Sequence, residues 1–311
     1  MNDTARASSL PTISVVTAAR NMEALVGETI RSVVYQKQPG DQYVFIDGAS
    51  SDGTVDIAKS FGDAIDVLIS EPDAGQYHAI AKGFDTATGD ILSWINADDI
   101  LMPWTFSVVR EVFDRFPDVH WITGSPSFLA DNSQLTRTEA KLPAYPRDFI
   151  ANGWFRPKLG GFLQQESMFW RRSLWDRVGG LDLSLKLAAD FELWTRFAVH
   201  ADLIPVNIPL AAFRERPGLQ RSSTDKDQYD TEVARVCSTK QSPRKLWGWM
   251  ANHSGVSLNI ARLMISARQS AISFNFRTRE WDMITRRRSL SRLTLGELTD
   301  LWYLRPTSDK K

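Results

Sequence analysis

Short apolar runs alternate with helix-like segments along the first hundred residues, and this alternation constrains the fold more than any other feature of the sequence. Runs rich in Val, Ile, Leu and Phe predict buried strands, here at residues 13–17, 43–46, 66–70 and 91–95. Apolar residues at helical spacing predict helices between them, at residues 23–36, 55–61 and 77–87. Strands that alternate with helices in this way build βαβ units. The sequence therefore predicts an α/β fold around a mostly parallel sheet flanked by helices.

Composition limits the class of protein. The 311 residues allow one large domain with an appendage, or two domains. Lys and Arg balance Asp and Glu at 37 each, so no global field favours nucleic acid. The single cysteine, Cys237, excludes an internal disulfide framework and a cysteine-rich zinc site, and it fits a reducing compartment. Residues 1–12 carry no apolar signal core and no run of 18 apolar residues occurs. We therefore expect a cytoplasmic protein that meets a membrane only at its surface.

Two adjacent carboxylates, Asp98 and Asp99, follow the strand expected at residues 91–95. Neighbouring anions repel each other and are costly to bury, so a purely structural role gives them little use there. A divalent cation removes the repulsion, because Mg²⁺ or Mn²⁺ takes one or two carboxylates together with substrate phosphates. The alternative is a solvated turn in which one of the two caps the helix expected at residues 104–116.

Other polar loops follow other strands of the same sheet. Asp47 opens a small polar loop after the second strand, and residues 71–76 form a loop after the third. In parallel sheets, ligands bind in the crevice at the carboxyl ends of the strands. Carboxylate-bearing loops that converge on one edge favour a ligand site over separate helix caps.

Six segments of the sequence resemble motifs of family 2 glycosyltransferases with the GT-A (Rossmann-like) fold, and they occur in the order found in that family. The run at 46–54 resembles the family's nucleotide loop, and Asn96-Ala97-Asp98-Asp99 resembles its DXD-type metal motif. The remaining similarities are the segments 79–83, 164–172 with 178–182, 189–196 and 213–214. The resemblance covers residues 11–222 and implies a nucleotide-binding half at 11–124 and an acceptor half at 125–222.

The resemblance also implies roles for individual residues. Asp99 would bind the metal ion, Mg²⁺ or Mn²⁺, while Asp98 would contact the ribose or a metal-bound water. Asp190 would be the catalytic base. The expected contacts to the nucleotide sugar come from Thr17, Asn21, Asp47, Ser50, Asp52, Gln76, Lys82, Asp98 and Arg214. Arg216 is a second candidate for the diphosphate, since arginine pairs bidentately with phosphate oxygens. The alternative for both arginines is a solvated loop.

Asp190 and Glu192 must be distinguished, because both lie in one expected helix. Residues two apart on a helix diverge by about 200°, so only one of them faces the cleft. The resemblance favours Asp190. Its structural alternative is a surface carboxylate that pairs with Arg196 or with solvent.

Residues 125–160 mix Pro, Asn, Asp and aromatics without a steady period. Loops over a catalytic edge commonly carry specificity, and the resemblance assigns this region to the acceptor side. Trp154 could stack on a sugar face or belong to the core. Gln165 and Glu166 complete the expected acceptor contacts.

The chain beyond residue 222 is basic: residues 226–311 hold 16 Lys and Arg against 8 Asp and Glu. Apolar residues at helical spacing predict a helix across residues 254–276, within a basic helical region at 223–311. Such a segment can lie on anionic lipid, pack on the catalytic domain or join two subunits as a homodimer. Residues 1–10 are expected to be a flexible leader.

Together these features predict an inverting, metal-dependent glycosyltransferase of the hexosyltransferase type. It would move a sugar from a nucleotide-sugar donor to a saccharide or lipid-linked acceptor in cell-surface polysaccharide synthesis, in the cytoplasm or at the inner membrane face. One rival is a sugar-nucleotide pyrophosphorylase, but residues 17–21 lack the Gly- and Arg/Lys-rich loop expected there. Another is a non-catalytic saccharide-binding or nucleotide-binding scaffold of the same fold.

Overall fold

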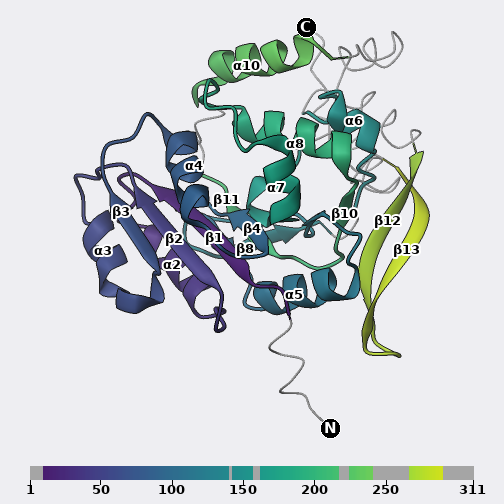
Figure 1. Cartoon of the computed structure of the whole chain (residues 1–311), viewed down its shortest axis with the longest axis horizontal. Coiled ribbons are helices and arrows are strands. Elements are labelled where there is room, and N and C mark those ends of the chain that lie inside the picture. The colour runs from purple at the N-terminus through teal and green to yellow at the C-terminus, as the bar shows by residue number, and fades with distance from the viewer. Residues whose placement is uncertain (1–9, 140–141, 157–161, 217–223, 241–265, 290–311) are drawn as a thin grey trace, which may run out of the picture.

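The computed structural model describes residues 10–139, 142–156, 162–216, 224–240 and 266–289. The expected leader at 1–10 therefore lies almost wholly outside the described residues. A seven-stranded sheet runs through the centre of the molecule in the order β10-β6-β9-β4-β1-β2-β3 (Figure 1). Its strands are β1 Ile13–Ala19, β2 Gln42–Asp47, β3 Val67–Ser70, β4 Ile91–Trp94, β6 Trp121–Thr123, β9 Met168–Arg171 and β10 Leu203–Pro205.

Helices cover both faces of this sheet, because apolar side chains of each strand point alternately to either face. Val16 and Val44 pack with one set of helices, and Val15 and Phe45 pack with the other. The first set is α4 Gln76–Thr86, α6 Arg147–Ala151, α7 Arg172–Val178 and α8 Ala189–His200. The second set is α2 Val26–Val34, α3 Thr54–Ser60 and α5 Thr105–Arg115. The predicted layered α/β architecture is confirmed.

The strand order places a ligand crevice between β1 and β4. Strands β1, β2, β3 and β4 are parallel, with β2 on one side of β1 and β4 on the other. Connections therefore leave in opposite directions at this point, and a crevice opens at the carboxyl ends of the two strands. The loops at 20–25 and 95–99 begin there. Strand β9 runs antiparallel between β4 and β6.

A second sheet lies beside the crevice. Its strands run in the order β5-β11-β7-β8, and they are β5 Ile100–Leu101, β7 Ser127–Leu129, β8 Leu135–Thr138 and β11 Ala211–Arg214. Two turns of 3-10 helix, η1 Gly62–Ala64 and η2 Gln165–Ser167, are also present among the described residues. Within residues 125–160, which show no steady period, the described parts at 125–139 and 142–156 contain two short strands and a short helix.

Helix α4 approaches the sheet closely because of Gly83. A Cβ atom at this position would lie 2.4 Å from Cγ1 of Val16 in β1. Real Cβ contacts are never so short, so glycine lets the helix lie directly on the strand. This close packing holds the N-terminal end of α4 at the crevice.

The C-terminal region corrects one expectation. Helix α10 Lys226–Ser238 is present, but the helix expected across residues 254–276 is wrong over 266–275. These residues form β12 Ser266–Asn275, which pairs along its length with β13 Glu280–Ser289 (Figure 1). Residues 254–265 lie outside the described part.

Tertiary pairing explains this difference. Ala267 and Ala271 are four apart, a spacing that places side chains on one face of a strand as well as of a helix. The hairpin is anchored beside β10 through Ile272, which bridges to Val206 and accepts a hydrogen bond from Asn207 N. In addition, Gln269 is buried and donates to Leu203 O. Among the described residues, no helix is both long enough and apolar enough to span a bilayer.

Candidate active site

The loops that follow β1 and β2 are joined by hydrogen bonds. Asn21 adopts a left-handed backbone (φ 54°), and its Oδ1 accepts a hydrogen bond from Ser51 N at 2.9 Å. Its own N–H donates to Ser50 Oγ at 2.8 Å. Glu23 N donates to Asp52 Oδ2 at 3.1 Å, and Gly53 N donates to Glu23 Oε2 at the same distance. The two loops therefore form one rigid wall of the crevice.

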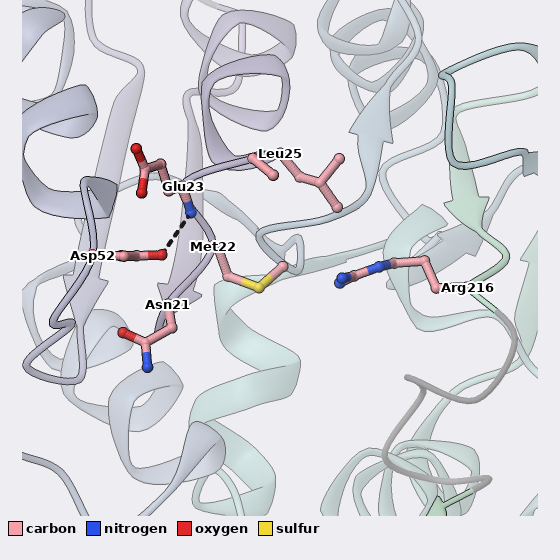
Figure 2. A pocket seen from close by; sticks show the side chains of 7 residues that line it. Asn21, Met22, Glu23, Leu25, Asp52 and Arg216 are labelled. Atoms are coloured by element: carbon pink, nitrogen blue, oxygen red, sulfur yellow. Dashed lines mark hydrogen bonds between the residues drawn. The ribbon is translucent and has the colours of Figure 1, made fainter.

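An open pocket of about 450 Å³ lies against this wall. It is lined by Asn21, Met22, Glu23, Ala24, Leu25, Asp52 and Arg216. Figure 2 shows Arg216 on the opposite side, with its guanidinium pointing across the pocket toward Met22. The pocket thus combines acceptor groups on one wall with a cation on the other, as a phosphate-bearing nucleotide requires.

Asp47 supports the wall from within. It is fully buried at the end of β2, where its carboxylate accepts hydrogen bonds from both the N–H and the hydroxyl of Ser50 and from Ser70 Oγ at 2.7 Å. Thr17 is also fully buried, and it accepts a hydrogen bond from Tyr43 OH at 3.1 Å. Both residues, expected to touch the nucleotide sugar, contact protein groups beneath the pocket.

The acidic loop after β4 holds its two aspartates differently. The side chain of Asp98 is 26% exposed, whereas Asp99 is only 1% exposed. The Asp99 carboxylate accepts hydrogen bonds from Arg214 N at 2.8 Å and from Asn96 Nδ2 at 3.1 Å. Burial raises the pKa of Asp99 well above its usual range, and the charges of Asp98 and Glu166 raise it further. Asp98 is therefore the aspartate that faces solvent.

Arg214 holds this loop in place. Its guanidinium is buried and donates to the carbonyl oxygen of Asp98 at 2.7 Å and to Glu28 Oε2 at 2.7 Å. It also reaches Ser133 Oγ at 2.9 Å. The residue that meets the Asp98 carboxylate is Arg216, at 3.4 Å. Arg214, expected to bind the diphosphate, thus supports the loop, and Arg216 is the arginine on the pocket.

Gln165 and Glu166 lie behind the acidic loop. Gln165 is buried and donates a hydrogen bond to Trp94 O at 2.6 Å, at the end of β4. Glu166 is 2% exposed, and its charge acts on Asp99. Gln165 therefore supports the start of the loop, whereas Glu166 adds a third negative charge close to Asp99.

Two further expected contacts lie away from the pocket. Lys82 forms an ion pair with Glu71, at a partly exposed site. Trp154 packs edge-to-face on Phe149, with ring centroids 5.1 Å apart. The structure therefore does not bring Lys82 and Trp154 together with the pocket residues.

Asp190 lies in the first turn of α8, where the helix dipole favours a negative charge. Its Oδ1 accepts hydrogen bonds from Tyr77 OH at 3.0 Å and from Phe191 N at 2.7 Å. Burial raises the pKa of Asp190 above its usual value, although these two hydrogen bonds oppose the shift. A carboxylate with a raised pKa is suited to accept a proton.

Glu192 has a structural role. It forms a bidentate ion pair with Arg196, at 2.7 and 2.6 Å, and Arg196 also donates to Val178 O and Gly180 O. The structural alternative considered for Asp190, a pair with Arg196, therefore applies to Glu192.

Consecutive residues at the start of α4 connect the acidic loop with Asp190. Gln76 Nε2 donates to Asn96 Oδ1 at 2.7 Å, and Tyr77 OH donates to Asp190. Gln76 was expected at the site, but the importance of Tyr77 was missed. Its position directly after Gln76 could have indicated a role at the site, but an apolar core is an equally good explanation for a buried tyrosine.

The acidic loop fits a divalent cation. Within the described residues there is no group of three or more His, Cys, Asp or Glu side chains arranged as a complete metal site. Mg²⁺ and Mn²⁺ do not require one, because substrate phosphates and water complete their coordination. The charges of Asp98 and Glu166 both act on buried Asp99. A cation bound beside them would relieve this repulsion.

Comparisons with known proteins agree with this geometry. Residues 14–178 match the family described as Glycosyl transferase family 2. An uncharacterized glycosyltransferase of Mycobacterium tuberculosis is 28% identical over 210 residues, which are 66% of this chain and 76% of that protein. A PGL/p-HBAD biosynthesis glycosyltransferase of the same species is 23% identical over 225 residues, covering 70% and 82%.

Solved structures share the fold. S. aureus TarS in complex with UDP-GlcNAc superposes with a TM-score of 0.58 and 16% identity, over 80% of this chain and 71% of that one. The mannosyltransferase PcManGT from Pyrobaculum calidifontis, in complex with GDP-Man and Mn²⁺, gives a TM-score of 0.52 and 19% identity, over 76% and 67%. The family match spans more than half of the chain and includes the crevice between β1 and β4. The chain therefore belongs to glycosyltransferase family 2 and has the GT-A fold.

Proposed function

We propose that this enzyme transfers a hexosyl group from a nucleotide sugar to a hydroxyl group of its acceptor, with inversion at the anomeric carbon. The observation that carries the proposal is the link made by Gln76 and Tyr77. Through these neighbours, one helix end connects the acidic loop with Asp190. A leaving-group site and a base must lie on opposite sides of the reacting sugar, and this link fixes their separation.

The nucleotide lies in the pocket lined by Asn21, Asp52 and Arg216. Arg216 pairs with the diphosphate, and the wall formed by the two loops accepts hydrogen bonds from the nucleoside. Asp47 and Ser50 act indirectly, by holding that wall rigid. The nucleotide sugars bound in the TarS and PcManGT structures support this class of donor.

Asp98 is the residue proposed to hold Mg²⁺ or Mn²⁺, since it is the exposed aspartate of the acidic loop. When bound there, the cation supplies charge neutralisation of the leaving diphosphate. The Mn²⁺ of the PcManGT complex supports this assignment. Asp99 then stabilises the acidic loop, because its buried carboxylate accepts hydrogen bonds from Arg214 N and Asn96 Nδ2. This reverses the roles that the resemblance implies for the two aspartates.

Asp190 is proposed as the general base. It takes the proton of the acceptor hydroxyl while the acceptor oxygen forms a bond to the anomeric carbon. The bond from that carbon to the diphosphate oxygen breaks on the opposite face, so the configuration inverts. Tyr77 holds the carboxylate by a hydrogen bond and limits the rise of its pKa.

Asp190→Asn tests the base directly. The variant keeps the shape of the side chain and removes its basicity, so donor binding should persist while turnover falls by about 10²–10⁴-fold. Glu192→Gln is not a neutral control, because it breaks the ion pair with Arg196. Asp85→Asn, at an exposed position on α4, is the matched control and should retain wild-type turnover. Near-normal turnover by Asp190→Asn, or a product that retains configuration, would refute the mechanism.

A non-catalytic scaffold of the same fold is separated from an enzyme by donor hydrolysis. Metal-dependent release of nucleoside diphosphate without an acceptor requires an active site, whereas a scaffold binds the donor unchanged. Slow release should be measurable with wild-type protein and absent in a variant that cannot bind the cation, Asp98→Asn.

The acceptor is proposed to be saccharide or lipid-linked, and the protein to work at the inner face of the membrane. The relative named for PGL/p-HBAD biosynthesis supports a lipid-linked acceptor. The hairpin of β12 and β13 supports a surface contact with lipid, because Arg268 and Arg287 lie directly opposite each other and are exposed. Like charges at opposed positions are destabilising unless an anion compensates them. A homodimer through this C-terminal region is the alternative partner.

A further inference from the structure

Helix α10 lies against the turn that leads into α8, the helix of Asp190 (Figure 1). Val233 of α10 packs with Ala188 and Phe191, on either side of the first turn of α8. Arg235 donates to Ser184 Oγ at 2.7 Å. Helix α10 begins almost fifty residues beyond the segment that matches the family. Its contact with α8, the helix of Asp190, is therefore not part of that match.

The central contact is made by Glu232. Its carboxylate accepts hydrogen bonds from three consecutive backbone N–H groups: Lys186 N at 3.1 Å, Leu187 N at 2.9 Å and Ala188 N at 3.0 Å. Gln228, one turn earlier on α10, donates to the same carboxylate at 3.1 Å. Glu232 is 9% exposed, and these hydrogen bonds keep the pKa of its carboxyl below the usual value despite its burial. It is therefore ionised at neutral pH.

The three N–H groups bound by Glu232 lie immediately before α8, since Ala188 is the residue at its N-terminal cap position. Three successive N–H groups that point into one concavity form a site for an anion. Glu232 fills this site from a different helix. The turn before Asp190 is therefore held by a side chain that is distant in the sequence.

The same turn is adjacent to the reacting carboxylate on its other side. Leu187 O lies 3.2 Å from Tyr77 OH, which donates to Asp190. A shift of residues 186–188 therefore moves both the backbone that begins α8 and the partner of the base. An error of about 1 Å in the placement of a catalytic group costs on the order of 10²-fold in rate.

We propose that Glu232 is a positioning residue for Asp190, so that helix α10 is required for transfer through this contact. The inference rests on the proposed role of Asp190 as base. It assigns to the C-terminal helix a part in catalysis in addition to any membrane or subunit contact of that region.

Steady-state kinetics of the full chain test this inference. Glu232→Ala should lower kcat by about 10²-fold. The KM for the donor should change less than about threefold, because the nucleotide pocket lies in the loops after β1 and β2. Glu232→Gln keeps an acceptor oxygen and should restore most of the lost kcat. Asp227→Asn removes an equal charge from an exposed position on α10 and should leave kcat unchanged.

Circular dichroism and thermal unfolding verify folding, since a folded variant keeps the wild-type spectrum and a cooperative transition. If Glu232→Ala fails this check, the comparison is made with Glu232→Gln, which should then show the partial loss of kcat. The inference is overturned if folded Glu232→Ala keeps wild-type kcat, or if its kcat and donor affinity fall together. Where Glu232→Gln takes its place, a kcat equal to that of Asp227→Asn overturns the inference. It is overturned equally if Asp227→Asn reproduces the loss.

Combining the variants separates this inference from the proposed function. In an Asp190→Asn background, Glu232→Ala should reduce turnover no further, because the group that it positions is already lost. If Asp190→Asn alone retains turnover, the proposed base is wrong and the role of Glu232 falls with it. If Asp190→Asn is inactive while Glu232→Ala is fully active, only the inference about Glu232 fails.

Discussion

The hydroxyl of Tyr77 donates a 3.0 Å hydrogen bond to Oδ1 of Asp190, across 113 positions of sequence. Tyr77 belongs to α4, which lies on the strands of the nucleotide side, whereas Asp190 opens α8. The contact therefore joins helices α4 and α8 at the residue proposed to act as base. It makes the proton affinity of that base depend on a helix that Gly83 fixes against β1.

Tyr77→Phe should move the acidic limb of the rate profile to higher pH. The hydrogen bond from Tyr77 lowers the pKa of Asp190, so its loss raises that pKa further above the usual value. The base works in its ionised form, and kcat is therefore lost as pH falls through a now higher pKa. At pH values well above that limb, kcat should recover most of its wild-type value. The measurement is kcat against pH with saturating substrates.

Tyr43→Phe is the matched control for this prediction. Tyr43 is also a buried tyrosine with one side-chain hydrogen bond, to Thr17, but it lies on the other side of the sheet. Its loss should leave the acidic limb in place. An unchanged pH profile for Tyr77→Phe, or an equal shift in both variants, would contradict the assigned role of Tyr77.

Substitutions in the acidic loop should separate metal binding from stability. Asp98→Asn should abolish the effect of Mn²⁺ on donor binding with little change in the free energy of unfolding, because Asp98 is partly exposed. Asp99→Asn should keep the Mn²⁺ effect but lower the free energy of unfolding by about 1–3 kcal/mol, since an amide nitrogen replaces the oxygen that accepts the hydrogen bond from Asn96 Nδ2. Calorimetry and denaturant unfolding measure the two quantities. The opposite pattern would restore Asp99 as the metal ligand.

Arg216→Ala should weaken the binding of nucleoside diphosphate by about tenfold or more, since a charge-assisted hydrogen bond contributes roughly 1.5–3 kcal/mol. Affinity for the uncharged nucleoside should not change, because only the diphosphate carries the charge that the arginine contacts. Arg20→Ala serves as the control, because Arg20 is an exposed arginine in the loop after β1. Equal losses for nucleoside and nucleoside diphosphate would remove Arg216 from the diphosphate site.

The hairpin should bind anionic bilayers through its arginines. Replacing both Arg268 and Arg287 with Glu should abolish sedimentation with anionic liposomes at low salt, where electrostatic attraction is least screened. Arg177→Glu changes an exposed arginine on α7 and should have little effect. If wild-type protein does not bind such liposomes, the membrane contact is wrong. A concentration-dependent dimer in solution would then support the homodimer.

Local patterns in the sequence were sufficient to predict the central fold. The strands β1 to β4 and their helices follow from short apolar runs and helical spacing, because both periodicities are set by burial against the same sheet. Asp98 was singled out because it follows a strand, and Asp190 because its segment resembles a motif of the family; the roles of both stay predictions. Neither judgement required knowledge of distant contacts.

Long-range contacts decided the features that the sequence left open. Arginine and aspartate are common in ligand sites, but the side chains of Arg214 and Asp99 bind other groups of the protein. Arg214 donates to Glu28, and Asp99 accepts from Asn96. The pairing of β12 with β13 and the bridge from Ile272 to Val206 likewise replaced an expected helix with a strand. Such outcomes depend on which segments meet, which a pattern along one chain does not encode.

The place of β9 between β4 and β6 bears on how this chain folds while it is synthesised. The apolar strand β4 precedes its neighbour β9 by more than seventy residues. The edge of β4 that pairs with β9 therefore has no partner until residue 171 has left the ribosome. An unpaired apolar edge is prone to join another chain. A fragment that ends near residue 124 should therefore aggregate even though it contains every loop of the nucleotide pocket except the one that carries Arg216. The nucleotide-binding and acceptor halves that the resemblance implies are therefore expected to fold as one unit.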